Sequence, residues 1–218
     1  MRGALKRPES RNDSVISASI FVSSLWTQLS WIGIDGYNPF QVDNGALQGG
    51  MFSYIPCGGT ASYYAYVGWE IVNTVFSVNP GDIMYVEVSD PLGGTNNGSV
   101  YIEDLTTLTY NAYSIPVGFP IIGNSAQWVV ERLCCEGEFP YPLLNTIAIF
   151  FDGGAAITGN GKVFYPGSSA ASTAVMTMRD DGNTQNIEIV SRGSTGSQGQ
   201  SAILLQDTGC AFAGGCVP

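Results

Sequence analysis

The chain contains no histidine, and this limits the chemistry that its side chains can perform. Ser-His-Asp and Cys-His arrangements for nucleophilic catalysis need an imidazole, and so does a histidine-ligated zinc ion. Eighteen Asp and Glu residues remain, and a carboxylate acts as a general acid or base when the operating pH lies near its pKa. The sequence therefore favours proton transfer by carboxylates, without a cofactor or a metal.

Glu131 is the first candidate for this chemistry, because it ends an alternating run over residues 126–131. Successive side chains of a strand point to opposite faces, so Glu131 is expected to share a face with Gln127 and Val129, while Trp128 takes the other. A carboxylate in such a row has a defined position. The pattern alone leaves open a more ordinary alternative, a solvated residue at the end of a strand.

Gln48 is the second candidate, and it lies between Gly45 and the pair Gly49-Gly50. Glycines inside a strand weaken it but allow another backbone to approach closely. We interpret them as room for a peptide substrate beside an amide that can donate and accept hydrogen bonds. A glutamine in a glycine-rich turn is the alternative.

Four motifs, in this order, resemble successive motifs of the glutamic peptidases, the eqolisin family of acid proteases. They are Trp31-Ile32-Gly33-Ile34-Asp35-Gly36, Leu47-Gln48-Gly49-Gly50, Pro80-Gly81-Asp82 and Ala126-Gln127-Trp128-Val129-Val130-Glu131-Arg132. The resemblance covers about residues 17 to 207. It implies an all-β fold, a two-sheet antiparallel β-sandwich of the concanavalin A-like kind. It also places the family's catalytic Gln on Gln48 and its catalytic Glu on Glu131.

The activity that this resemblance implies is that of a secreted, pepstatin-insensitive acid endopeptidase. Its Gln/Glu dyad would activate a water molecule and stabilise the tetrahedral intermediate formed from a peptide bond. Protein or peptide substrates are the expected partners.

Five further residues are candidates for substrate binding or for positioning the dyad. Asp35 could orient a catalytic neighbour through a hydrogen bond, or belong to an ordinary Asp-Gly turn. Trp31 belongs to the first motif. Tyr66 and Trp69 could form cleft walls, although aromatic residues in strands more often pack in cores. The resemblance aligns a family Glu with Glu70.

Three departures from the family pattern keep other functions open. No counterpart of the family's first Asn-Trp-Gly-like strand is found, Phe52 replaces an acidic residue, and Asn73 replaces a proline. One alternative is a catalytically inactive β-sandwich binding module. The other is a glycoside hydrolase that uses Glu70 and Glu131 as its two carboxylates.

The length of 218 residues is typical of one β-sandwich domain, which we place at residues 15–218. Residues 1–14 are polar and basic, and we expect them to be disordered or the remnant of a pro-segment. A net charge of −10 argues against nucleic-acid binding. No apolar run approaches the length needed to cross a membrane, so we expect a soluble protein, and a monomer.

Cysteines and glycosylation sequons indicate a secretory route. Cys57, Cys134, Cys135, Cys210 and Cys216 lack the spacing of a zinc site. Sequons at Asn12 and Asn97 accompany them, and both features are typical of an oxidising compartment. The disulfide connectivity stays open.

Alternating segments punctuated by Gly, Asn and Pro predict strands along the whole chain. They are expected at residues 17–22, 31–35, 83–89, 99–103, 146–151, 174–178, 186–190 and 202–206. Without the family's first strand, residues 15–22 are expected at a sheet edge, which they either close or leave open to self-association.

Overall fold

The computed structural model describes ten segments of the chain. They are residues 14–21, 28–36, 45–54, 60–69, 73–90, 96–118, 120–131, 149–166, 188–194 and 201–207. All the regular secondary structure in these segments is β-strand, as the sequence predicts. The Gly, Asn and Pro punctuation leaves only short extended segments between turns, and their alternating residues suit a pleated sheet with one buried face.

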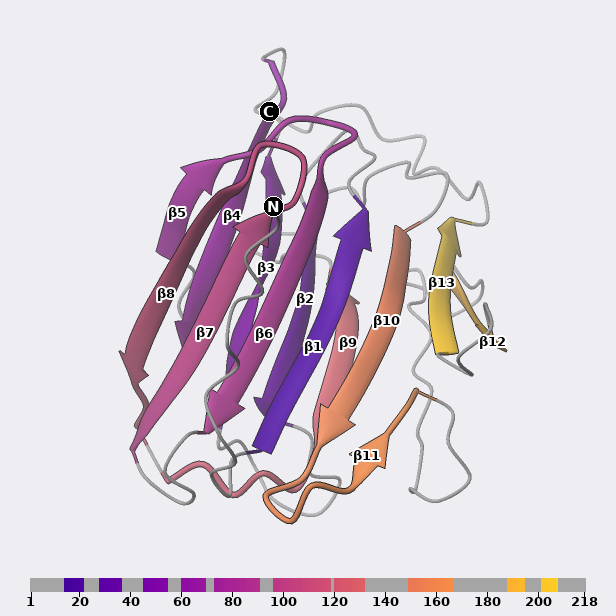
Figure 1. Cartoon of the computed structure of the whole chain (residues 1–218). Helices are drawn as coiled ribbons and strands as arrows, with labels where there is room; N and C mark the ends of the chain where they lie inside the picture. Colours follow the sequence, from indigo (N-terminus) through magenta and orange to yellow (C-terminus); the bar gives the residue numbers. More distant parts are fainter. Residues whose placement is uncertain are drawn as a thin grey trace, which may run out of the picture.

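The strands form two antiparallel sheets. In order along the eight-stranded sheet, they are β12 (Glu188–Ser194), β13 (Ser201–Asp207), β10 (Ile149–Ile157), β1 (Ser14–Phe21), β6 (Ile83–Asp90), β7 (Asn97–Asp104) and β8 (Thr109–Pro116), while β11 (Val163–Phe164) pairs with β10. The five-stranded sheet has the order β5 (Asn73–Ser77), β4 (Ser62–Trp69), β3 (Ala46–Tyr54), β2 (Gln28–Asp35) and β9 (Ala126–Glu131). Figure 1 shows the first sheet in front of the second, which confirms the predicted β-sandwich.

The main core fills the space between the two sheets. The five-stranded sheet contributes Ile32, Leu47 and Met51, and the eight-stranded sheet contributes buried aliphatic side chains such as Val86 and Ile102. In β6 and β7 these residues alternate with outward-facing ones, as expected for a sheet that buries one face, whereas β3 is buried at every position from 47 to 51.

Gly49 lies on the face of β3 that packs against the other sheet. A Cβ atom at this position would lie only 2.5 Å from a methyl group of Val100 on the opposite sheet. The space beside this glycine is therefore taken by sheet packing, and our interpretation of it as room for substrate is wrong.

Strand β1 is an interior strand. Its residues pair with β6 on one side and with β10 on the other, for example Ser17 with Glu87 and with Ala155. The expectation of an edge strand at residues 15–22 is therefore wrong. The strand begins at Ser14, one residue before the predicted domain boundary.

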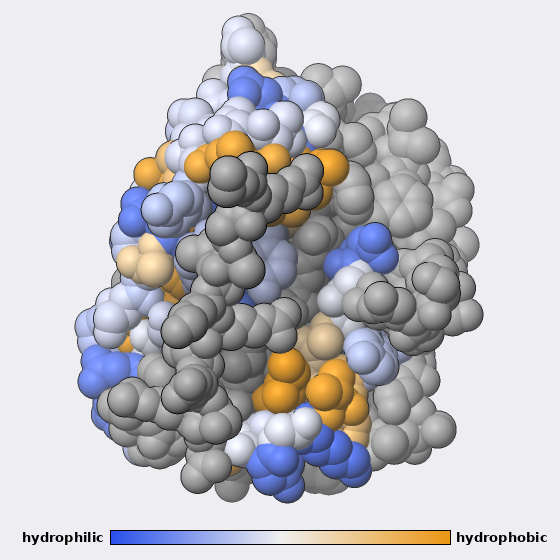
Figure 2. Space-filling model, viewed as in Figure 1, coloured by the Kyte–Doolittle hydropathy of each residue, from blue (hydrophilic) through white to orange (hydrophobic). Residues whose placement is uncertain are grey.

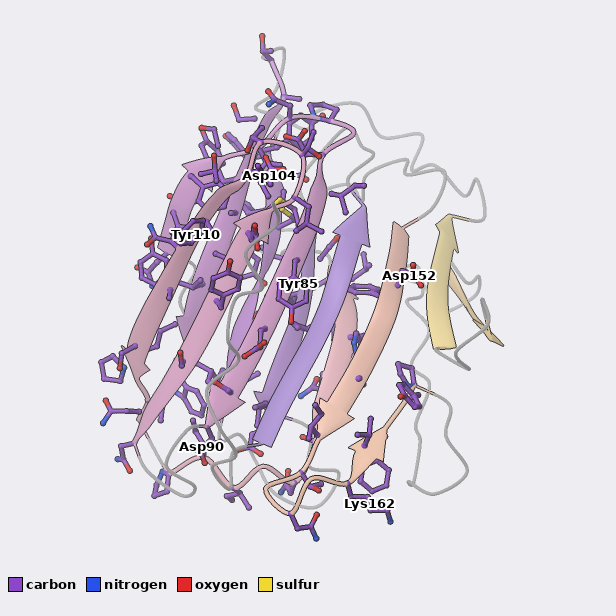
Figure 3. All side chains as sticks on the ribbon, viewed as in Figure 1. Tyr85, Asp90, Asp104, Tyr110, Asp152 and Lys162 are labelled. Atoms are coloured by element: carbon purple, nitrogen blue, oxygen red, sulfur yellow. The ribbon has the colours of Figure 1, made fainter. Side chains whose placement is uncertain are left out.

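The outer face of β6, β7 and β8 carries tyrosines and glutamates. Tyr85 and Tyr101 meet edge to face, and Tyr101 stacks on Tyr110 of β8, which is 64 % exposed. Each of the first two hydroxyls donates to a glutamate of its own strand, and the Tyr101 bond to Glu103 is 2.7 Å long. Figure 3 labels Tyr85 and Tyr110 on this side, and Figure 2 shows mainly hydrophilic residues along its left and lower margins.

The turn between β7 and β8 is built on Asp104. Its carboxylate accepts hydrogen bonds from the amides of Thr106 and Thr107 and from the Thr107 hydroxyl, at 2.8, 3.1 and 2.7 Å. Burial acts to raise the pKa of Asp104, but these hydrogen bonds outweigh it, and the pKa lies below its usual value. Figure 3 shows this residue at the end of β7.

Several predicted features lie outside the described residues. They are Glu70, the five cysteines, Asn12, residues 1–13 and the strand expected at 174–178. Across the described segments, no helix has the length and apolar character needed to cross a membrane.

Candidate active site

The candidate site lies on the face of the five-stranded sheet that points away from the main core. Strand register sets three cross-strand rows on this face, in the order β9, β2, β3, β4: Gln127–Gly33–Gln48–Gly68, then Val129–Trp31–Gly50–Tyr66, then Glu131–Leu29–Phe52–Tyr64. The predicted alternation of β9 is confirmed, because Trp128 and Val130 pack in or against the main core. The two candidates, Gln48 and Glu131, therefore share one face and stand two rows apart.

Glu131 is held by Trp31 of the neighbouring strand. The indole Nε1 of Trp31 donates a hydrogen bond of 3.0 Å to Oε2 of Glu131. The indole is buried, whereas the glutamate is half-buried. A hydrogen bond to a charged group is worth more than a neutral one, so the indole fixes one carboxylate oxygen.

Gln48 is held by Tyr66 in a similar way. The Tyr66 hydroxyl donates a hydrogen bond of 2.9 Å to Oε1 of Gln48, and the tyrosine is fully buried while the glutamine is 8 % exposed. Because the amide oxygen accepts from the hydroxyl, the amide nitrogen Nε2 points elsewhere. The contact therefore decides which end of the amide presents its two N–H donors.

Tyr66 also connects the two halves of the site electrostatically. Burial, and then the negative charge of Glu131, raise the pKa of Tyr66 well above its ordinary value of 10.0. The phenol consequently remains a hydrogen-bond donor throughout the acidic and neutral range. Trp31 and Tyr66 belong to one buried cluster with Leu29, separate from the main core. Trp31 and Tyr66 lie in the row between those of Gln48 and Glu131, and Leu29 lies in the row of Glu131.

Two glycines allow Trp31 and the backbone of β2 to pack closely on this face. A Cβ at Gly33 would lie 2.8 Å from Cζ3 of Trp31 and 2.9 Å from the carbonyl oxygen of Leu47. A Cβ at Gly50 would lie 2.1 Å from the carbonyl oxygen of Ser30 and 2.7 Å from Cα of Trp31. The space beside Gly33 is thus used by the indole that holds Glu131, and the space beside Gly50 by the backbone of β2. Both glycines belong to the first two motifs, so the sequence carries a signal for this close packing.

Asp35 forms hydrogen bonds to residues other than Gln48 and Glu131. Its carboxylate accepts hydrogen bonds from the amides of Ile122 and Asn124, at 2.7 and 3.1 Å, and its carbonyl oxygen accepts one from Nε2 of Gln127. Asp35 and Gly36 both have positive φ angles, 65° and 80°. Asp tolerates this conformation better than most residues, and Asp35 ends β2 where its carboxylate holds the amides of residues 122 and 124.

Trp69 stands on the opposite face of β4 from Tyr66. It pairs with Leu47 and packs against the main core. The structure therefore does not bring Trp69 to the face of Gln48 and Glu131. Glu70 lies outside the described residues, so its position relative to Glu131 is not part of this geometry.

Metal-ligating side chains do not gather at this site. Within the described segments, no three His, Cys, Asp or Glu residues lie close enough together to hold a metal ion. The chemistry available on this face is that of one carboxylate, one primary amide, an indole N–H and a phenol.

Comparison with known proteins assigns the chain to a family. The sequence matches the model of the Peptidase A4 family over residues 8–199. The chain belongs to the Peptidase A4 family. No curated protein sequence matches the chain significantly.

Solved structures of glutamic peptidases share the fold of this chain. Scytalido-glutamic peptidase, with a transition state analog inhibitor, superimposes with a TM-score of 0.67 at 19 % identity, covering 91 % of this chain and 94 % of that one. SCP-B, a member of the Eqolisin family of peptidases in complex with the tripeptide Ala-Ile-His, gives a TM-score of 0.66 at 19 % identity, with the same coverage of both chains. Aspergilloglutamic peptidase from Aspergillus niger gives 0.66 at 21 % identity, covering 84 % of this chain and 100 % of that one.

The predicted resemblance to the glutamic peptidases is thereby confirmed at the level of family and fold. Membership of the Peptidase A4 family supports a peptidase function for the chain. The roles of individual residues rest on the geometry of the site.

Proposed function

We propose that the chain is an acid endopeptidase in which Gln48 and Glu131 act on a water molecule and a peptide carbonyl. The observation that carries this proposal is the placement of an amide and a carboxylate on one sheet face, each held at one atom by a buried hydrogen-bond donor. Such fixed polar groups favour a transition state because they need little reorganisation during the reaction.

In the first step, the ionised Glu131 accepts a proton from a water molecule whose oxygen forms a bond to the carbonyl carbon of the substrate. Because Trp31 holds Oε2, the other carboxylate oxygen, Oε1, is the one assigned to the water. The carbonyl π electrons move to its oxygen, and the Nε2 donors of Gln48 stabilise that developing negative charge. An amide donor suits acidic conditions because it keeps its protons at any pH.

In the second step, the protonated Glu131 gives its proton to the leaving nitrogen while the carbon–nitrogen bond breaks. The electrons of the oxyanion re-form the carbonyl, and the products are a carboxylic acid and an amine. Glu131 then returns to its ionised state, so one carboxylate serves as base and afterwards as acid.

Hydrolysis of an unfolded protein substrate between pH 2 and 7 tests this function, with pepstatin present to suppress contaminating aspartic proteases. The parent is compared with Glu131→Gln and Gln48→Ala, and all three are first checked for folding by circular dichroism. We expect cleavage only at acidic pH, with a loss of at least about 100-fold in kcat for Gln48→Ala, as for other donors to an oxyanion.

Each outcome of this experiment separates the alternatives. Equal activity in the parent and in Glu131→Gln would exclude the dyad. A folded parent that cleaves no protein at any pH would favour the inactive binding module or the glycoside hydrolase, and glycan substrates would be tested next.

We further propose that the enzyme is secreted and acts as a monomer on protein substrates. The acidic composition and the Asn97 sequon, at the exposed start of β7, support an extracellular setting. A mass shift on treatment with an N-glycosidase, after expression in a eukaryotic host, tests the first part, and sedimentation over a range of concentrations tests the second. Secretion without any glycan on Asn97 would contradict the use of this sequon.

A further inference from the structure

Three aromatic rings extend the site beyond the dyad. Phe52 and Tyr64 occupy the same cross-strand row as Glu131, separated from it by Leu29, and Tyr54 follows Phe52 on the same face of β3. The ring of Phe52 stacks on both tyrosines, with centroid distances of 6.2 Å to Tyr54 and 6.4 Å to Tyr64. We call Phe52, Tyr54 and Tyr64 the aromatic shelf.

The aromatic shelf is accessible, unlike the cluster next to it. Tyr54 is 38 % exposed, and Phe52 and Tyr64 are half-buried, whereas Leu29 and Tyr66 beside them are buried. Phe52 packs against that buried cluster from its edge. The shelf is therefore fixed on its inner side, and its rings keep surface that a ligand can cover.

Its distance from Glu131 suits a peptide side chain near the scissile bond. Neighbouring strands lie about 4.8 Å apart, so Phe52 stands about 10 Å from the Glu131 backbone across β2. An extended peptide advances about 3.3 Å per residue, which places the shelf within about three residues of the bond that Glu131 acts on.

We propose that the aromatic shelf is a specificity subsite that selects an apolar or aromatic side chain of the peptide substrate. Stacked rings bind such side chains by removing apolar surface from water and by offset stacking. An acidic side chain would lose hydration there without gaining a partner from the ring faces, which carry negative charge density. This inference rests on the proposed peptidase function, and it names the substrate class that the site prefers.

Internally quenched peptides that differ at one position test the subsite. Each position within three residues of the cleaved bond is varied in turn among Phe, Leu, Ser and Lys, and kcat/KM is measured for the parent, Phe52→Ser and Tyr110→Ser. Tyr110 is the matched control, because it is a stacked ring on the other sheet.

At one position, we expect the parent and Tyr110→Ser to prefer Phe or Leu over Ser by about ten-fold or more, as apolar pockets do for added apolar groups. In Phe52→Ser, this preference should fall to about two-fold or less, with the same peptide bond cleaved. Should Phe52→Ser fail to fold, Tyr64→Ser, which removes a ring that is only half-buried, is expected to lower the same preference at the same position.

The results separate this inference from the proposed function. An unchanged preference in folded Phe52→Ser or Tyr64→Ser would overturn the subsite while leaving the dyad intact. Cleavage that survives Glu131→Gln would overturn the proposed function, and a parent that cleaves no peptide would overturn both.

Discussion

Replacing Tyr66 by Phe removes one oxygen atom from a buried contact at the centre of the site. The hydroxyl donates to Oε1 of Gln48 at 2.9 Å, and neither residue is more than 8 % exposed. Without the hydroxyl, the Gln48 oxygen loses its donor. A phenyl ring at position 66 does not favour the oxygen end of the amide over the nitrogen end. The variant therefore tests whether Tyr66 orients the amide.

The size of the effect follows from the energetics of buried hydrogen bonds. Leaving a buried acceptor without its donor costs about 1–3 kcal/mol, which corresponds to a factor of about 5 to 150. If the hydroxyl serves to orient the amide for the transition state, most of this cost should appear in kcat. We expect kcat to fall about ten-fold and KM to change by less than about two-fold. The free energy of unfolding should decrease by about 1 kcal/mol.

The assay is steady-state hydrolysis of a quenched peptide at acidic pH, combined with urea unfolding of the same preparations. Tyr101→Phe is the control, because it removes a hydroxyl that donates to Glu103 at 2.7 Å on the outer face of the other sheet. Its kcat should match the parent. An unchanged kcat in folded Tyr66→Phe would refute the orienting role, and so would an equal loss in Tyr101→Phe.

Three further substitutions test other parts of the structure. Trp31→Phe removes the 3.0 Å indole bond to the carboxylate and should lower kcat by about ten-fold or more, since bonds to charged groups are worth about 1.5–3 kcal/mol. Trp128→Phe is its control, because the buried Nε1 of Trp128 has no hydrogen-bond acceptor among the described residues, and normal kinetics are expected. Gly33→Ala should displace the Trp31 ring, which would lie 2.8 Å from the new Cβ, and so reduce both activity and stability; retention of both would contradict that packing. Asp104 has a lowered native pKa, so its contribution to stability is present above the unfolded value of 3.8 and is lost as the pH falls through the native pKa. Asp104→Asn should therefore be less stable than the parent at pH 6 by about 1–3 kcal/mol in urea unfolding, with a smaller difference at pH 2; a constant difference would contradict the linkage.

Regular alternation made much of the fold predictable. The strands expected at residues 83–89 and 99–103 are found as β6 and β7, because every second residue there is apolar and buried in the main core. The edge strands β5 and β8 were missed. In β8 the outward positions are exposed and even the inward Tyr113 and Ile115 are only half-buried, so the sequence carries little apolar periodicity. An edge strand is held largely by pairing with one neighbour, and this pairing leaves a weak local signal.

Local patterns placed the candidate dyad but not its connections. The alternation of β9 put Glu131 on a defined face, yet the donor that holds it comes from Trp31, one hundred positions earlier. The link between Tyr66 and Gln48 likewise depends on the register of β3 with β4, which sets Gly50 opposite Tyr66. Register is a property of two strands together, so residue types along one strand do not reveal it. For the same reason, Trp69 resembled a site residue, although it packs against the core.

The core on one face of β3 fixes the chemistry on the other. Leu47 and Met51 are buried between the sheets, and because the side-chain period of a strand is two, Gln48 and Phe52 must point to the opposite face. A slip of one residue would put the Gln48 amide into an apolar core and would expose Leu47, and both changes cost free energy. The burial that holds the two sheets together therefore also keeps Gln48 on the face of Glu131, and it aligns Phe52 in the same row as that carboxylate. For this reason, a substitution that disturbs Leu47 is expected to impair the site although its side chain points away from it.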